Sequence, residues 1–174
     1  MIRSTTRISM ALLLATNLGI ALADDTTSKQ FVKDAVESNL AEIQASQLAL
    51  SKSSNPGVKT FAQQMVDDHT MANNQLQAVA EHMGIKIPDR PDLTHQAAIE
   101  SLQSKSSAAG FDKSYIAQMN KDHEKAIELF QAAANSAQVD PELKALAQKT
   151  LPTLHQHQHT VMQLASGETA GSRR

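Results

Sequence analysis

The stretch "FAQQMVDDH", residues 61–69, has the residue spacing that decides the fold. Its apolar residues recur every three to four positions, and at about 100° per residue this spacing places them on one face of a helix. That face continues through Ala72 and Leu76. His69 falls inside its edge and Asp68 flanks it. The stretch therefore predicts an amphipathic helix that carries a polar pair beside the core.

A second stretch, "YIAQMNKDH" at residues 115–123, repeats this pattern 54 residues later. It has the same helical spacing, so its histidine also falls inside the edge of an apolar face. We interpret the two stretches as an internal repeat, a duplicated helical hairpin, and we expect both histidines to face the core at similar depth. The polar and sulfur-containing positions that match are Met65 with Met119, Asp68 with Asp122, and His69 with His123.

The rest of the chain is also helical in pattern, because β-branched and aromatic residues are sparse and Ala, Gln, Leu, Lys and Glu dominate. Asn55-Pro56 and Asp140-Pro141 each combine a helix-capping side chain with a proline suited to the first helical position. Gly84 ends one helix, Gly110 interrupts another, and Asp112 is expected to cap the helix that follows. We therefore predict helices at residues 28–53, 56–83, 93–108, 112–137 and 141–165.

Four long amphipathic segments and one short segment predict an all-α antiparallel four-helix bundle. The short extra helix falls in the connection between the second and third long helices. Residues 24–166 would form this single domain. The small and polar residues 167–174 are expected to form a flexible C-terminal tail.

The first residues, "MIRSTTRISMALLLATNLGIALADD", have the three parts of a secretory signal. Arg3 and Arg7 supply positive charge, residues 10–22 form a short apolar core, and Ala21-Leu22-Ala23 is a small-residue cleavage pattern. We predict a signal peptide at residues 1–23, cleaved near Ala23, and a periplasmic or secreted mature chain. A membrane anchor is disfavoured because spanning a bilayer takes about 20 predominantly apolar residues. No later segment is apolar enough to span a membrane.

Composition excludes several classes of protein. The chain has no cysteine, so thiolate metal sites, disulfides and the lipid-attachment cysteine of a lipoprotein are excluded. Removing the signal leaves 14 basic against 18 acidic residues, a net charge of −4 with neutral histidines. An acidic chain with one tyrosine and no tryptophan is a poor candidate for binding nucleic acid. No nucleophile elbow, phosphate loop or dinucleotide fingerprint is present, so no enzymatic reaction is predicted.

Two further residues point towards the predicted core. In "LHQHQH", residues 154–159, the helical spacing puts His157 at the centre of the apolar face, while His155 and His159 point to the opposite face. On the first helix, Glu42 lies beside the apolar face among small residues, where it is either half-exposed or turned inward.

Two readings of these inward polar residues remain open. The first is a metal site formed by Glu42, Asp68, His69, Asp122, His123 and His157, whose imidazoles and carboxylates suit Zn, Fe, Mn or Cu. Met65 and Met119 would join only if the metal is copper, because methionine at core spacing is usually core filler. The second reading is a structural hydrogen-bond network inside a non-catalytic envelope stress or interaction protein. Such a protein would act through an envelope partner or as a homo-oligomer.

The chain resembles the bacterial exported proteins of the domain-of-unknown-function 4142 family, formerly described as predicted outer-membrane proteins and regarded as ferritin-like. The resemblance rests on residues 40–69 ("LAEIQASQLALSKSSNPGVKTFAQQMVDDH"), 111–130 ("FDKSYIAQMNKDHEKAIELF") and 140–157 ("DPELKALAQKTLPTLHQH"). It implies a ferritin-like bundle in the cell envelope and brings no established activity. The polar positions that it carries over are Glu42, Asp68, His69, His123 and His157. It does not carry over His82, His95, His155 or His159.

The sequence departs from the ferritin-like di-iron pattern, in which two helices each carry Glu-x-x-His. Three residues before His69 stands Val66, and three residues before His123 stands Asn120. The carboxylates instead adjoin the histidines, about 100° round the helix. The sequence therefore argues against oxygen-activating di-iron chemistry.

Overall fold

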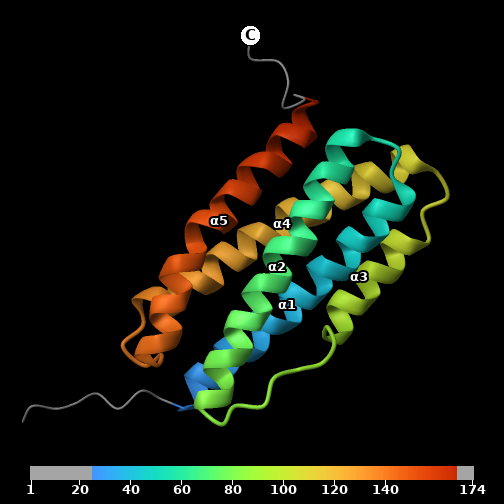
Figure 1. Ribbon diagram of the computed structural model, residues 1–174. Coiled ribbons are helices and arrows are strands. Elements are labelled where there is room, and N and C mark those ends of the chain that lie inside the picture. The colour runs from blue at the N-terminus through green and yellow to red at the C-terminus, as the bar shows by residue number, and fades with distance from the viewer. Residues whose placement is uncertain (1–24, 168–174) are drawn as a thin grey trace, which may run out of the picture.

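The computed structural model describes residues 25–167 (Figure 1). The predicted signal peptide at 1–23 and residues 168–174 of the predicted tail lie outside this range. Within it, all regular secondary structure is helical, which confirms the all-α prediction, and no helix is long and apolar enough to cross a membrane. The helices are α1 (Asp25–Lys52), α2 (Pro56–His82), α3 (Leu93–Gln103), α4 (Ala108–Asn135) and α5 (Pro141–Ser166).

Two helices begin at the predicted caps. The Asn55 side chain accepts hydrogen bonds from the backbone N–H groups of Gly57 and Val58, and Pro56 opens α2. Asp140 caps α5 in the same way, ahead of Pro141. These side chains satisfy backbone donors that have no partner inside the helix, which fixes where each helix starts.

The start of α4 differs from the prediction. Ser107, not Asp112, caps α4, and its hydroxyl accepts from the Gly110 backbone N–H at 3.1 Å. A Cβ on Gly110 would lie 2.9 Å from the Ser107 hydroxyl, so the glycine permits this close cap instead of interrupting a helix. Asp112 lies one turn inside α4. Consequently α3 ends at Gln103, five residues before the predicted boundary.

The long helices form a bundle with one long crossover. α1 and α2 make one antiparallel hairpin and α4 and α5 the other, while α1 also packs on α4 and α2 on α5 (Figure 1). Both of these last two pairs are antiparallel. Along α1 and α4, Phe31 contacts Phe130 and Ser46 contacts Tyr115. Along α2 and α5, Asp68 contacts His157 and His82 lies near Glu142.

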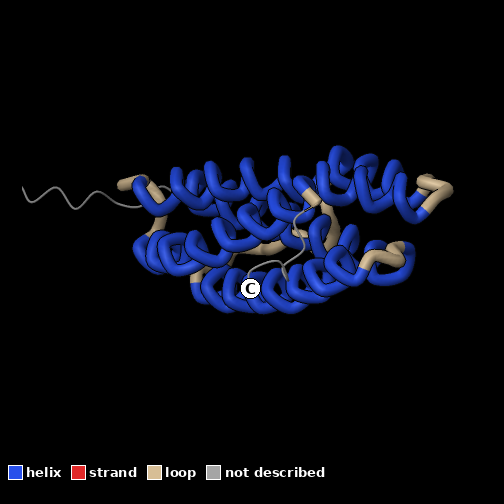
Figure 2. Tube along the Cα trace, turned by 90° about the horizontal axis from the view of Figure 1, so that it is seen from above, coloured by secondary structure: helices blue, strands red, loops and turns tan. Residues whose placement is uncertain are grey.

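This arrangement makes α2 and α4 parallel and places them diagonally across the core. The chain must therefore return along the whole bundle between them, and residues 83–107 with α3 make that crossover, with α3 packed mainly on α1. One long crossover is the ferritin-like topology, so the predicted fold is confirmed. Seen from above, the helices run along one axis with most loops at the two ends (Figure 2).

The parallel course of α2 and α4 explains what the two similar stretches have in common. His69 and His123 are both buried and enter the core from diagonal corners. The two stretches do not occupy equivalent places in their hairpins, because α2 is the second helix of its hairpin with α1 and α4 is the first helix of its hairpin with α5. The similarity therefore covers the two helical stretches themselves.

The core consists of two apolar clusters with a polar layer between them. One cluster, which includes Phe31, Phe130 and Leu143, fills the end where α1 begins. The other, which includes Phe61 and Phe111, fills the opposite end. Glu42, His69, His123 and His157 lie along their helices between the two clusters and are all buried.

Candidate metal centre

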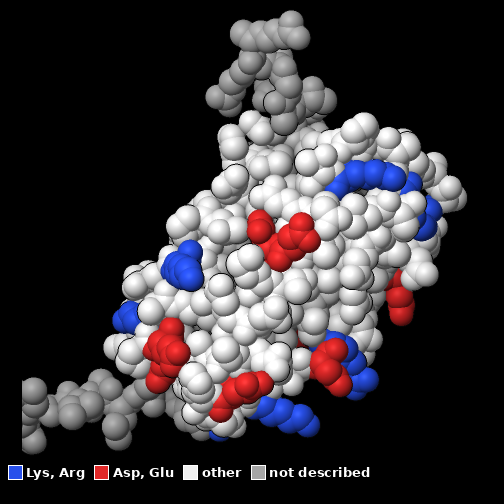
Figure 3. Space-filling model, viewed as in Figure 1, with Lys and Arg blue, Asp and Glu red and all other residues white. Residues whose placement is uncertain are grey.

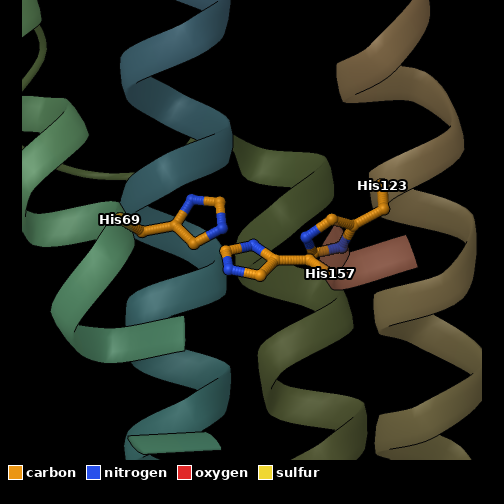
Figure 4. A group of neighbouring side chains, drawn as sticks. All are labelled: His69, His123 and His157. Atoms are coloured by element: carbon orange, nitrogen blue, oxygen red, sulfur yellow. The ribbon is translucent and has the colours of Figure 1, made fainter. Parts of the chain in front are cut away.

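Three histidines from three helices meet in this polar layer (Figure 4). His69 comes from α2, His123 from α4 and His157 from α5, and their exposed fractions are 3%, 0% and 1%. One ring nitrogen from each lies within 4.8 Å of the others. The ring centroids are 5.3–5.7 Å apart. The predicted convergence of the three residues is therefore present.

Glu42 of α1 completes the group from the fourth long helix. Its side chain is 1% exposed, and its Oε2 lies 2.9 Å from His69 Nε2 and 3.9 Å from His123 Nε2. Its other oxygen accepts a 3.3 Å hydrogen bond from the Ser38 hydroxyl. Of the two orientations left open by the sequence, the structure shows the inward one.

The second nitrogen of each histidine ring is bonded away from the group. His69 Nδ1 lies 2.8 Å from Asn39 Oδ1, His123 Nδ1 lies 2.9 Å from the Met119 carbonyl oxygen, and His157 Nε2 lies 2.8 Å from Asp68 Oδ2. All three partners are oxygens that only accept, so each of these ring nitrogens donates and carries the hydrogen. The other nitrogen of each ring, which carries the lone pair when the ring is neutral, therefore faces inward.

The inward-facing atoms have no hydrogen-bond partner among the described residues. These atoms are Glu42 Oε2, His69 Nε2, His123 Nε2 and His157 Nδ1, and all four are buried. His69 Nε2 lies 2.9 Å from Glu42 Oε2, the distance of an ion pair when this imidazole is protonated, although the two atoms are not aligned as a hydrogen bond. Buried polar atoms are nearly always paired, and these four unpaired acceptors face one another, an arrangement that could hold a metal ion.

The electrostatics of the group favour such a cation. Burial raises the pKa of Glu42, but the neighbouring histidines, His69 and His123 foremost, outweigh burial and hold that pKa at about 2. Burial lowers the pKa of His157 to about 4, assisted by His69 and opposed by the bond to Asp68. At neutral pH the group therefore presents an ionised carboxylate and a neutral His157 imidazole, which are the ligand forms that metals bind.

The two aspartates predicted for the site occupy different positions. Asp68 bonds the outer nitrogen of His157 instead of joining the inward atoms. Asp122 is buried, and both of its oxygens accept from the Gln118 amide at 2.8 Å. Burial raises the pKa of Asp122, and the described contacts include no ion pair between this carboxylate and a histidine.

The remaining candidates lie outside the group. Met65 and Met119 are buried in the apolar cluster at the α4 start, one turn before the two histidines. The histidines that the sequence excluded stay away from the centre, with His82, His155 and His159 exposed and His95 bonded to Asp92.

Sequence reasoning missed Asn39. It lies three residues before Glu42 on the same face of α1, is 5% exposed, and its amide donates to Asn73 at 3.0 Å while its oxygen accepts from His69. The signal was the spacing of Asn39, Glu42 and Ser46, three polar residues on the buried face of one helix.

The comparisons with known proteins agree with this architecture. The crystal structure of a DUF305 fragment from Deinococcus radiodurans matches 83% of this chain and 99% of that chain, with a TM-score of 0.73 and 14% sequence identity. At that identity the likeness shows the fold alone. A search of curated proteins found no match. The family model for the domain of unknown function DUF4142 matches residues 15–164, and the chain therefore belongs to the DUF4142 family.

Proposed function

We propose that this bundle binds one transition-metal ion through Glu42, His69, His123 and His157. The observation that carries the proposal is the set of four buried acceptor atoms that converge without a hydrogen-bond donor among the described residues. Each long helix contributes one of the four, so a bound ion would join all four helices.

The hydrogen bonds among the described residues leave these four atoms without a donor. Each neutral imidazole has one N–H hydrogen, and the three rings use theirs on Asn39, the Met119 carbonyl and Asp68. Adding one proton to a ring supplies one donor, and a water molecule supplies two hydrogens. Either one alone leaves two of the four acceptors without a donor, whereas a single cation accepts all four lone pairs.

The distances suit a tetrahedral ion. Zinc–nitrogen and zinc–oxygen bonds of about 2.0–2.1 Å separate tetrahedral ligand atoms by about 3.3–3.4 Å. The distances of 2.9 Å and 3.9 Å from Glu42 Oε2 to His69 Nε2 and His123 Nε2 bracket that separation, and the three histidine nitrogens lie within 4.8 Å of one another. Three imidazoles with one carboxylate in a tetrahedral arrangement therefore favour Zn²⁺ over Mn²⁺, which prefers oxygen ligands, and copper(I) would be favoured by the methionine sulfurs.

The surroundings of the histidines also resemble those of metal ligands. In metal sites, the ring nitrogen that does not bind the ion donates to a carboxylate, a backbone carbonyl or another oxygen. Asp68, the Met119 carbonyl and Asn39 supply these three kinds of acceptor. These bonds fix the tautomer and the ring orientation that binding requires.

A site with four buried protein ligands is closed, because no coordination position is left for water or substrate. Catalytic zinc keeps an open position for water or substrate, whereas structural zinc is enclosed by four protein ligands. We therefore propose metal holding without catalysis, in which the ion stabilises the bundle or is stored by it. We further propose that this occurs in the periplasm, supported by the N-terminal signal pattern; the mature protein recovered from a periplasmic extract should begin at Asp24.

The test is a titration of metal-free protein with Co²⁺, whose absorption bands report tetrahedral coordination. Wild type should bind one equivalent, and His123→Ala should lose the tetrahedral spectrum. His155→Ala is the matched control, because His155 is an exposed histidine outside the centre, and it should titrate as wild type. A wild-type chain that gives no tetrahedral spectrum, or a His123→Ala variant that gives the same one, would sink the proposal and leave the hydrogen-bond network.

A further inference from the structure

Asp68 is a partly exposed neighbour of an otherwise buried centre. The four residues of the centre are at most 3% exposed, whereas the Asp68 side chain is 34% exposed. Its Oδ2 lies 2.8 Å from His157 Nε2, and the opposite nitrogen of the same ring faces the centre. A single imidazole ring therefore separates this partly exposed carboxylate from the inward-facing atoms.

Asp68 also lines a surface hollow of about 140 Å³ in the groove between α2 and α5. Figure 3 views the molecule from the side on which these two helices lie, where acidic and basic side chains are scattered over a largely uncharged surface. Two charged side chains line the hollow, the acidic Asp68 and the basic Lys149. Its lining includes Asp68, Met71 and Ala72 of α2 and Lys149, Thr150 and Thr153 of α5.

The outward partners of the other ligands offer no comparable route. Asn39, behind His69, is neutral and 5% exposed. The partner of His123 is a backbone carbonyl of its own helix. Glu42 is approached from outside by the neutral Ser38 hydroxyl. Asp68 is the outward partner that is both charged and partly exposed, so its carboxylate attracts a cation to this side, against the opposing charge of Lys149.

We propose that the metal ion reaches the buried centre through this hollow, with Asp68 as its first ligand and the His157 ring as the movable barrier. This inference rests on the proposed metal binding. An Asp68 carboxylate that takes up the ion releases His157 Nε2. The freed ring can then turn, and the ion passes to the inward nitrogens and Glu42. Return of Asp68 to His157 Nε2 closes the route.

The charge on Asp68 is tested by the rate of Co²⁺ binding to metal-free protein in a stopped-flow experiment at low ionic strength. Asp68→Asn keeps an oxygen acceptor for His157 but removes the charge, and association should slow by about tenfold, the lower end for charge-focused clefts. Asp67→Asn is the matched control, because this neighbouring aspartate is exposed and bonded to Gln63 as Asp68 is to Gln64. It should stay within about twofold of wild type.

The hollow itself is tested with a steric change. Ala72→Leu fills the hollow and should slow association and dissociation by the same factor, leaving the equilibrium Kd unchanged. Ala132→Leu, which fills a different hollow between α1 and α4, is the control and should leave both rates unchanged. Lys149→Gln removes the positive charge from the rim and should accelerate association.

The outcomes separate this inference from the proposed function. Association rates of Asp68→Asn and Ala72→Leu equal to those of their controls would overturn the route while one-to-one Co²⁺ binding stands. Faster dissociation of Asp68→Asn with unchanged association would also overturn it, since Asp68 would then only position His157. Absence of Co²⁺ binding to wild type at equilibrium would overturn both.

Discussion

Glu42→Gln offers the sharpest test of the electrostatics of the polar layer. The pKa of this carboxyl is lowered from its ordinary value of 4.5 to about 2 by His69 and His123 against the effect of burial. One pKa unit corresponds to about 1.36 kcal/mol, so the ionised form contributes roughly 3 kcal/mol to folding in metal-free protein. Glutamine has the same shape without the charge. It should reduce the free energy of unfolding by about 2–3 kcal/mol and lower Tm by about 5–10 °C.

The pH dependence of the free energy of unfolding tests the same effect independently. Because the folded pKa of Glu42 lies below the unfolded value, the native state binds fewer protons between them and stability rises with pH. The contribution is complete above pH 4.5 and is lost as the pH falls towards 2. Glu42→Gln should lack this part of the acid profile.

The assay is urea unfolding at several pH values with a chelator present. Glu124→Gln is the control, because Glu124 is exposed on α4, and its free energy of unfolding should stay within about 0.5 kcal/mol of wild type. A Glu42→Gln variant as stable as Glu124→Gln at pH 7, with an unaltered acid profile, would refute the reasoning.

Three further predictions concern neighbouring groups. The folded pKa of His157 lies at about 4, below its ordinary 6.5, so wild type should lose stability as the pH falls from 6.5 towards 4, and His157→Gln should flatten that slope in urea unfolding. Asn39→Ala removes the acceptor of His69 Nδ1 and should weaken metal affinity by about 10–100-fold in a competition titration. Ser46→Ala removes the 2.9 Å partner of the buried Tyr115 hydroxyl and should destabilise the bundle by about 1–3 kcal/mol.

Each of these changes has a matched control. His159→Gln alters an exposed histidine of α5, Asn74→Ala an exposed asparagine of α2, and Ser51→Ala an exposed serine of α1. The reasoning on His157 fails if both glutamine variants keep the wild-type slope. Equal metal affinity in the two asparagine variants would contradict the role of Asn39, and equal stability in the two serine variants that of Ser46.

The fold was predictable because local signals agree with the tertiary structure. The Asn55-Pro56 and Asp140-Pro141 pairs cap helices that the apolar spacing also predicts. The boundary between α3 and α4 was missed for a local reason. Gly110 reads as a helix breaker, yet in the first turn of α4 it makes room for the Ser107 hydroxyl.

The candidate site was predictable only as far as helical periodicity reaches. Spacing identifies which faces of the helices carry His69, His123 and His157, and all three are buried together. Spacing cannot say what a flanking side chain meets across a helix interface. Asp68 on α2 contacts His157 of the neighbouring helix α5. Asp122 lies on α4, whose neighbour α1 has no histidine, and it accepts instead from Gln118 of its own helix.

The most direct test of the central claim is the metal content of tag-free protein purified without added metal, measured by elemental analysis. The proposed centre predicts about one equivalent of a transition metal, zinc foremost, in wild type and in a His155→Ala/His159→Ala control, and almost none in His69→Ala/His123→Ala. The same near-zero content in all three proteins would contradict it.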